Sequence, residues 1–284
     1  MIDYEKSILL SYLQNLLSGP WARPQLIRQI CEYLDDHREL LGHDDDLLTE
    51  LIDDMQSGSE SRVHRRGETL KAGKVLRRLI KARLAGLACE PGLLEANLAL
   101  LAVHLKLDAL ERGFLGLVLR HQAYSDFARL LNEITKEDLG TIDASAWCLG
   151  VSSDQLQERL RPAGKLLLSG VLQPSKRTGT DLDDLVRVLE PVVNALHRNQ
   201  GGLKTLVAAI LGEPRQTELA WDDFAHFGPM RKRLEAFLRQ AVGKNLSGVN
   251  ILLWGPPGTG KTEFCKTLAA RLELKLYAVG ETDD

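Results

Sequence analysis

Eight consecutive residues near the C-terminal end of the sequence have the types and spacing of a phosphate-binding loop. They are Gly255, Pro256, Pro257, Gly258, Thr259, Gly260, Lys261 and Thr262. The run fits the pattern G-x-x-x-x-G-K-S/T, in which backbone N–H groups and the N-terminus of the following helix converge on a nucleotide phosphate. Because the two prolines have no N–H, we expect the N–H groups from Gly258 to Glu263 to form this cradle.

Individual residues of the loop have separate roles in the expected chemistry. Gly258 and Gly260 permit backbone angles and a close approach that a side chain would block. The Lys261 ammonium reaches the β- and γ-phosphates, and the Thr262 hydroxyl coordinates Mg²⁺. The sequence therefore predicts a nucleotide site, with Lys261 as the candidate catalytic residue and Thr262 as the candidate metal ligand.

The segments around the loop have the pattern that such a site requires. Residues 251–254, Ile-Leu-Leu-Trp, predict a strand that is apolar on both faces, which is typical of the centre of a parallel sheet. A helix is expected over residues 263–272 and a second strand over residues 274–279. The helix would bury Phe264, Leu268 and Leu272. Strand, loop, helix and strand together predict the start of an α/β domain.

A second informative stretch lies upstream of the loop, at residues 220–238, and reads AWDDFAHFGPMRKRLEAFL. Together with the loop it resembles the opening of an AAA+ ATPase domain of the AAA family, where a W-D-D-hydrophobic-G-G segment and an amphipathic helix precede the strand. Residues 221–224 match that segment, whereas Ala225 and His226 stand where the family usually has glycines. The apolar positions of the helix would be Met230, Leu234 and Leu238. The resemblance covers residues 218–284.

This resemblance implies cofactors and partners. ATP with Mg²⁺ would bind, and the neighbours of the adenine would be Asp223, Phe224 and Ala225. Trp221 and Phe224 have an alternative interpretation, which is ordinary packing between a linker and the ATPase core. In full-length form such proteins are homo-oligomeric rings that couple ATP hydrolysis to protein remodelling or unfolding. The helical N-terminal region would recruit a protein substrate or an adaptor.

ATP hydrolysis by this class needs further groups, which do not follow the loop in this sequence. They are an acidic motif at the end of another strand, a polar sensor residue and a neighbouring subunit's arginine. Only 22 residues follow Thr262 (284 − 262), and residues 280–282 separate their acidic pair, Asp283 and Asp284, from the expected strand. We therefore expect an N-terminal fragment of a longer ATPase, and hydrolysis by this chain alone is left open.

Helical periodicity runs through almost all of residues 2–211. In a first segment, residues 1–90, apolar stripes predict three helices before a polar break at residues 56–60. Residues 62–83 then carry nine basic side chains against one acidic residue, Glu68. This stretch is either a basic helix for an anionic partner or a solvated helix face, and the absence of interleaved aromatic residues favours the second interpretation.

A second segment, residues 91–214, begins after the turn-forming residues 90–92, Glu-Pro-Gly. An apolar stripe predicts its first helix, Asp108 with Glu111 predicts a capping box, and Gly113 with Gly116 predicts tight helix packing. The stripe consists of Leu94, Leu98, Leu101 and Leu105.

Residues 146–152 within this segment predict a helix-turn-helix, and residues 166–172 could supply a wing strand, so the segment resembles a winged-helix fold. The second helix, 152–161, has mixed charge, which favours a structural or protein-docking role over DNA reading. A further helix over residues 181–196, kinked at Pro191, and a linker at residues 212–214 precede the third segment, residues 215–284.

Composition gives broad limits on the class of protein. With 284 residues and a net charge of −3, the chain can bury large cores and has no general affinity expected for nucleic acid or acidic membranes. The four cysteines form no C-x-x-C pair, which argues for buried thiols in a reducing compartment; they are Cys31, Cys89, Cys148 and Cys265. The acidic N-terminus is unlike a signal peptide and no apolar run approaches 18 residues, so a cytoplasmic location is expected.

The leading hypothesis is an ATP-binding ATPase of the AAA family. Its fold would be a mainly α N-terminal region, with a helical bundle and a winged-helix-like subdomain, followed by the start of an α/β domain. Two alternatives stay open. One is a helical protein-interaction module with an inactive ATPase remnant, and the other is a DNA-linked ATPase that uses the winged-helix-like piece and residues 62–83.

Overall fold

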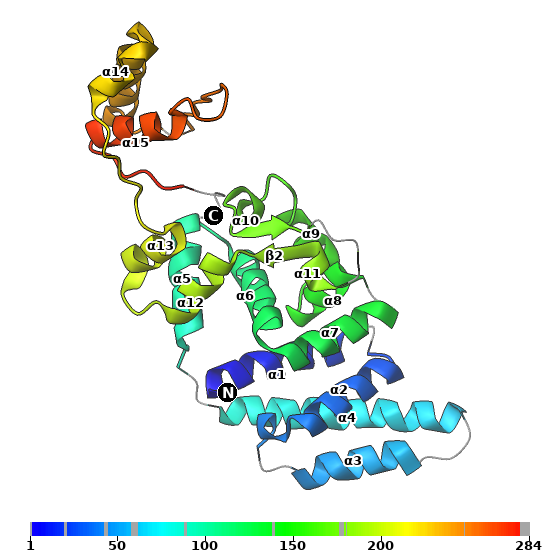
Figure 1. The fold of residues 1–284 in the computed structure, drawn as a ribbon. Coiled ribbons are helices and arrows are strands. Elements are labelled where there is room, and N and C mark those ends of the chain that lie inside the picture. The colour runs from blue at the N-terminus through cyan, green and yellow to red at the C-terminus, as the bar shows by residue number, and fades with distance from the viewer. Residues whose placement is uncertain are drawn as a thin grey trace. The chain divides into compact units, whose positions relative to one another are not determined.

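The computed structural model describes residues 2–19, 22–42, 45–57, 62–87, 90–137, 140–175, 179, 181–246 and 248–278. Contacts group the chain into two compact units, Met1–Leu206 and Val207–Asp284. The first unit contains all of the expected segment 1–90 and most of the segment 91–214, and the division between those two segments stays a prediction. Figure 1 labels the elements of both units.

The N-terminal unit begins with helices that pack around one long helix, α4. The elements are α1 (Asp3–Ser18), α2 (Pro24–Asp36), α3 (Asp45–Ser57) and α4 (Arg62–Gly86), and α1, α2 and α3 all contact α4. Leucine and isoleucine side chains on the inner faces are fully buried, among them Leu9, Leu13, Leu16, Ile30, Leu34, Leu76 and Ile80. The three predicted helices are confirmed. Residues 58–60 of the predicted polar break lie outside the described residues.

The unit continues with α5 (Leu93–Leu105), α6 (Ala109–Ala123), α7 (Ser125–Glu137), α8 (Thr141–Cys148) and α9 (Ser153–Arg159). The predicted capping box at the start of α6 is confirmed. The Glu111 N–H donates to Asp108 Oδ1 at 2.8 Å, and the Asp108 N–H donates to Glu111 Oε2 at 2.7 Å. Two backbone N–H groups that lack a partner within the helix are thereby hydrogen-bonded by side chains only three positions away.

A buried ionic network joins α1, α5 and α6. The Arg120 side chain is 2% exposed, donates to both Glu5 carboxylate oxygens at 2.8 and 2.9 Å, and donates to Glu95 at 3.1 Å. A methyl group on Gly116 would lie 2.8 Å from Arg120 Nη1, so the tight packing predicted for this glycine is confirmed. Because a buried charge is costly unless it is paired, α1 is held to the rest of the unit through Glu5.

The predicted helix-turn-helix is present as α8, a turn and α9. Gly150 has a φ of 69°, which suits glycine at the turn, and Ser152 caps α9 by accepting from the Gln155 N–H at 3.3 Å. After it come α10 (Lys165–Leu168) and a two-stranded antiparallel sheet of β1 (Leu172–Pro174) and β2 (Val186–Val188), with Leu172 opposite Val188.

Two predictions in this region are wrong. Of the expected wing strand at residues 166–172, residues 166–168 lie in helix α10 and only Leu172 lies in a strand, β1, because a short apolar run has no periodicity that separates strand from helix. The helix expected over residues 181–196 is three elements, α11 (Leu182–Leu185), β2 and α12 (Glu190–Arg198). Pro191 lies in the first turn of α12 and starts a helix where a kink was expected, since proline is favoured at that position.

The C-terminal unit has a small aromatic core. Its elements are the end of α13 (Gly202–Leu211), the 3₁₀ segment η2 (Trp221–Phe227), α14 (Pro229–Gly243) and α15 (Lys261–Arg271). The core consists of buried Phe224, Phe264 and Leu268, with partly buried Trp221, Phe227, Leu234, Leu238, Leu253 and Leu272 packed against it. The expected burial of Met230 is wrong, because its side chain is 64% exposed.

The two strands expected in this unit do not form a sheet among the described residues. Residues 251–254 are not paired with any strand, and Leu252 and Trp254 are 85% and 87% exposed. Of the second expected strand, only Leu276 makes a bridge, in which its carbonyl accepts from the Arg215 N–H at 2.8 Å. A strand is stabilised by hydrogen bonds to a neighbouring strand, and residues 251–254 make none with the described residues of this unit.

Three of the cysteines are free thiols: Cys31 and Cys148 are buried and Cys265 is half-buried. Burial raises the pKa of the Cys31 thiol to about 12, so this thiol is protonated and inert at neutral pH. Cys89 lies outside the described residues. No helix in the described ranges is long and apolar enough to cross a membrane.

Candidate functional site

The glycine loop has left-handed backbone angles at two of its positions. Gly258 and Gly260 have φ angles of 77° and 79°, and Gly260 directly precedes α15. Residues with a Cβ rarely adopt these angles, so the sequence needs glycine here. The loop therefore reaches the first turn of α15 in the way that the sequence pattern predicts.

The first turn of α15 exposes backbone donors. Within the described residues, the N–H groups from Gly258 to Thr262 donate no hydrogen bond to another backbone carbonyl, and the first such bond of the helix runs from the Phe264 N–H to the Gly260 carbonyl at 2.8 Å. Unpaired N–H groups at a helix N-terminus carry partial positive charge. The arrangement suits an anion with several acceptor oxygens, such as a phosphate.

The Lys261 ammonium is folded back over the loop. It donates to the carbonyl oxygens of Gly255 at 3.0 Å and Pro256 at 2.7 Å, and lies 3.4 Å from Thr259 Oγ1. Thr259 in turn donates to the Pro256 carbonyl at 3.0 Å. The cation is thus held beside the exposed N–H groups by neutral oxygens, which an anionic phosphate would replace with a stronger, charge-assisted contact.

Glu263 and Thr262 differ in their surroundings. The Glu263 carboxylate pairs with Lys266 at 2.6 Å and accepts from the Thr217 hydroxyl at 3.2 Å. These two partners, Lys266 first, hold the pKa of Glu263 below its usual value. Thr262 is exposed. Its hydroxyl is therefore open to a metal ion bound with a nucleotide, and its role as a Mg²⁺ ligand stays a prediction.

An aromatic layer supports the loop from within the unit. The Phe224 ring meets the Phe264 ring edge-on at 5.4 Å, and a methyl group on Gly260 would lie 3.7 Å from the Phe224 ring. Phe227 packs on Phe264 at 4.8 Å. Phe224, which is 3% exposed, thus has the packing role that the sequence offers as an alternative to adenine contact.

The other expected adenine neighbours lie in the same short segment as Phe224. Asp223 accepts from the Ala220 N–H at 2.8 Å and so caps η2, and Ala225 is exposed. His226 stacks at a tilt on Phe227, with 4.5 Å between the ring centres. The structure places these residues on one turn beside the loop's supporting core, and their contact with adenine stays a prediction.

Trp221 has charged neighbours that the sequence did not indicate. The Arg271 and Arg231 guanidinium carbons lie 4.9 and 5.3 Å from the centre of its ring. Arg271 also pairs with Glu235 at 2.8 Å and, as the largest cause, lowers the pKa of that carboxyl. The i, i+4 spacing of Glu235 and Arg239 was visible in the sequence, but the contact with Arg271 joins two separate helices.

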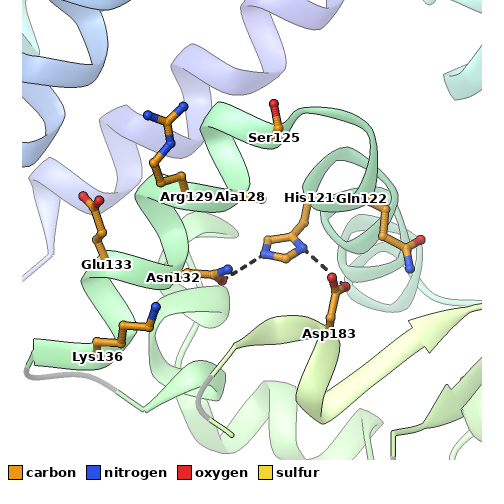
Figure 2. Close-up of a pocket in the computed structure, with 9 residues that line it drawn as sticks. All are labelled: His121, Gln122, Ser125, Ala128, Arg129, Asn132, Glu133, Lys136 and Asp183. Carbon is orange, nitrogen blue, oxygen red and sulfur yellow. Dashed lines mark hydrogen bonds and ion pairs between the residues drawn. The ribbon is translucent and has the colours of Figure 1, made fainter. Parts of the chain in front are cut away.

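A separate cavity of about 450 Å³ lies in the N-terminal unit between α6, α7 and α11. Its lining residues are His121, Gln122, Ser125, Ala128, Arg129, Asn132, Glu133, Lys136 and Asp183. Figure 2 shows the His121 ring between Asn132 and Asp183, at 3.0 and 3.5 Å. Burial disfavours the charged imidazole, but Asp183 and Asn132 outweigh it and raise the pKa of His121. No pattern along the chain indicates this pair, because 62 positions separate His121 from Asp183.

The candidate acidic motif, Asp283 and Asp284, lies outside the described residues. Among the residues that are described, no group of three or more histidine, cysteine, aspartate or glutamate side chains could hold a metal ion.

Comparison with known proteins relates the C-terminal part of the chain to ATPases. Residues 251–282 match the family described as "ATPase family associated with various cellular activities (AAA)". The Xenopus tropicalis protein "Pachytene checkpoint protein 2 homolog" is 38% identical over 65 residues, which cover 20% of this chain and 15% of that protein. The Arabidopsis thaliana protein of the same name is 36% identical over 64 residues, covering 19% and 14%.

The chain spans about 15% of the length of these relatives. No solved structure gives a significant match.

Proposed function

We propose that the chain binds Mg-ATP and, in full-length form, couples ATP hydrolysis to protein remodelling, because residues 251–282 match the AAA family of ATPases. The observation that carries this proposal is the geometry of the loop. Unpaired N–H groups from Gly258 to Thr262 and the Lys261 ammonium lie together at the N-terminus of α15. When bound, ATP supplies the phosphoanhydride bond that such enzymes hydrolyse.

The residues of this chain have positioning roles in the proposed function. The N–H groups at the start of α15 hold the phosphate oxygens, and Lys261 moves from the loop carbonyls to the phosphates. Thr262 offers its exposed hydroxyl to Mg²⁺. The Phe224 ring packs beneath Gly260 and so supports the loop on the aromatic core. Asp223 and Ala225 would lie beside the adenine.

The N-terminal unit would recruit the protein that is remodelled, or an adaptor for it. The charges of α9 support protein docking over DNA reading by the helix-turn-helix. Arg159 is already engaged, with Asp108 at 3.1 Å and with Glu158 at 3.3 Å. A helix that reads DNA needs basic side chains free for phosphates and bases.

Titration of the chain with a fluorescent ATP analogue and Mg²⁺ tests the proposal. Lys261→Ala should weaken binding at least about tenfold, because it removes a charge-assisted contact to phosphate. Lys244→Ala is the matched control, since Lys244 is exposed at the end of α14 and carries the same charge. Unchanged affinity of the Lys261→Ala variant would show that the loop is not the nucleotide site.

A further inference from the structure

One face of α4 carries a dense row of basic side chains. Its members are all exposed: Lys71, Lys74, Arg77, Arg78 and Lys81. At 100° per residue these positions fall within an arc of about 120° on the helix surface. The sequence has no acidic residue from Thr69 to Leu87. The five side chains, defined here as the basic face of α4, therefore gather positive charge on one side of the helix.

Burial of the opposite side of α4 keeps the basic face turned toward the solvent. Ala72, Leu76 and Ile80 are buried, and α4 contacts α1, α2 and α3 along its length. Figure 1 shows α4 running alongside α2 and α3. Because its apolar side is occupied by the protein's own core, the helix cannot rotate to hide the charges, and the basic face is a permanent surface feature.

The cations of the basic face have no ion-pair partner among the described residues. In the described part of the chain, none of the five forms an ion pair, whereas other basic side chains do, including Arg159 with Asp108 and Arg271 with Glu235. Like charges on adjacent helical turns repel one another. An anionic partner along the face would relieve this repulsion and gain several attractive contacts at once.

We propose that the basic face of α4 docks an acidic segment of a protein partner. Resting on the proposed function, this partner is the protein that the ATPase remodels or its adaptor. The segment carries apolar side chains between its carboxylates, because Leu70 is 41% exposed at the N-terminal end of the face and Val75 is 37% exposed beside it. Apolar side chains of a protein segment can pack against Leu70 and Val75, whereas the phosphate backbone of a nucleic acid cannot.

Two other anionic partners fit the face less well. A bilayer needs an exposed apolar helix side to insert, and that side of α4 is buried. A nucleic acid would gain only charge contacts with phosphates here, and the exposed Leu70 and Val75 would stay unused. Aromatic side chains for base stacking are missing from the sequence of residues 62–86.

Binding of a labelled acidic peptide to the full chain tests this proposal. The probe is a 20-residue helical peptide with glutamates flanking leucines, and its control has every glutamate replaced by glutamine. Lys74→Gln/Arg78→Gln should weaken binding about 4- to 25-fold, since each of the two exposed charge contacts changes affinity by about two- to fivefold. Arg187→Gln/Arg198→Gln removes the same charge from exposed positions on β2 and α12 and should leave binding unchanged.

Leu70→Ser separates a protein partner from a nucleic acid. It should weaken binding of the acidic peptide, while binding of a labelled 20-base-pair duplex, if measurable, should depend on charge and salt alone. Equal peptide binding by the wild type and the Lys74→Gln/Arg78→Gln variant would overturn the proposal. Tighter binding of the duplex or of phosphatidylserine vesicles than of the peptide, lost in the same variant, would overturn the choice of partner.

The test is independent of the nucleotide site. Lys261→Ala should leave peptide binding intact, and Lys74→Gln/Arg78→Gln should leave affinity for Mg-ATP intact. If the nucleotide titration fails, the proposed ATPase function is excluded and the peptide-binding result still stands. If peptide binding fails, the docking proposal is excluded and the nucleotide result still stands. Circular dichroism of each variant checks that the exposed substitutions leave the helices folded.

Discussion

Replacing Gly260 with alanine separates the backbone geometry of the phosphate loop from steric crowding. A methyl group at this position would lie 3.7 Å from the Phe224 ring, which is an ordinary contact distance. The φ of 79°, by contrast, is left-handed, and a residue with a Cβ pays about 1–2 kcal/mol to adopt it. The cost of Gly260→Ala should therefore come almost entirely from conformation.

This cost can be read in nucleotide affinity. If the variant loop relaxes to a negative φ, the N–H groups at the start of α15 no longer converge, and restoring them for a ligand costs about 1–2 kcal/mol. Affinity for a fluorescent ATP analogue with Mg²⁺ should fall about 5- to 30-fold, at about tenfold for each 1.4 kcal/mol. Isothermal titration calorimetry with Mg-ATP gives the same quantity without a label.

Gly243→Ala is the matched control. Gly243 ends α14, has no positive φ, and a methyl group there would meet nothing within 4 Å. The same chemical change should stabilise the helix by about 0.5–1 kcal/mol and leave nucleotide affinity unaltered. Wild-type affinity in the Gly260→Ala variant would refute the argument that left-handed geometry at this position forms the phosphate cradle.

Three further perturbations probe the packing and the buried charges. Phe264→Ala should destabilise the C-terminal unit by about 3–5 kcal/mol in urea unfolding, because its ring contacts much of the aromatic core. Arg120→Met should cost about 3–5 kcal/mol, since it leaves the buried Glu5 carboxylate without a cationic partner, and the double change with Glu5→Gln should recover part of that loss. The raised pKa of His121 means that its pairing with Asp183 stabilises the fold fully below the ordinary histidine pKa of about 6.5; the contribution is lost as pH rises through the higher folded value. Thermal unfolding across this range should show the loss in the wild type and not in the Asp183→Asn variant.

Local signals in the sequence predicted their structures well. The glycine loop and the capping residues Asp108 and Ser152 act on backbone groups only a few positions away, so the residue types alone define the geometry. Helices with a clear apolar face were also predictable, because a single buried stripe distinguishes them from strands. The confirmed helices of the N-terminal unit all have such stripes.

The errors arose where the outcome depends on distant neighbours. The run Leu166–Leu168 is equally apolar at every position, so only its packing decides between helix and strand. Residues 251–254 have the composition of a central strand, but composition does not supply the neighbouring strand that pairs with it. The contact of Arg120 with Glu5 joins residues 115 positions apart, and no pattern along the chain indicates such a pair.

The place of Trp221 provides an optical readout of the phosphate loop. Its indole stacks on Phe264 at 5.9 Å, three residues beyond Lys261, and two guanidinium groups lie over the same ring. Indole emission responds to nearby charge, so a small shift of α15 on ligand binding should change the fluorescence of this tryptophan. Replacing the other tryptophans, Trp21, Trp147 and Trp254, with phenylalanine would leave an intrinsic reporter that needs no labelled nucleotide.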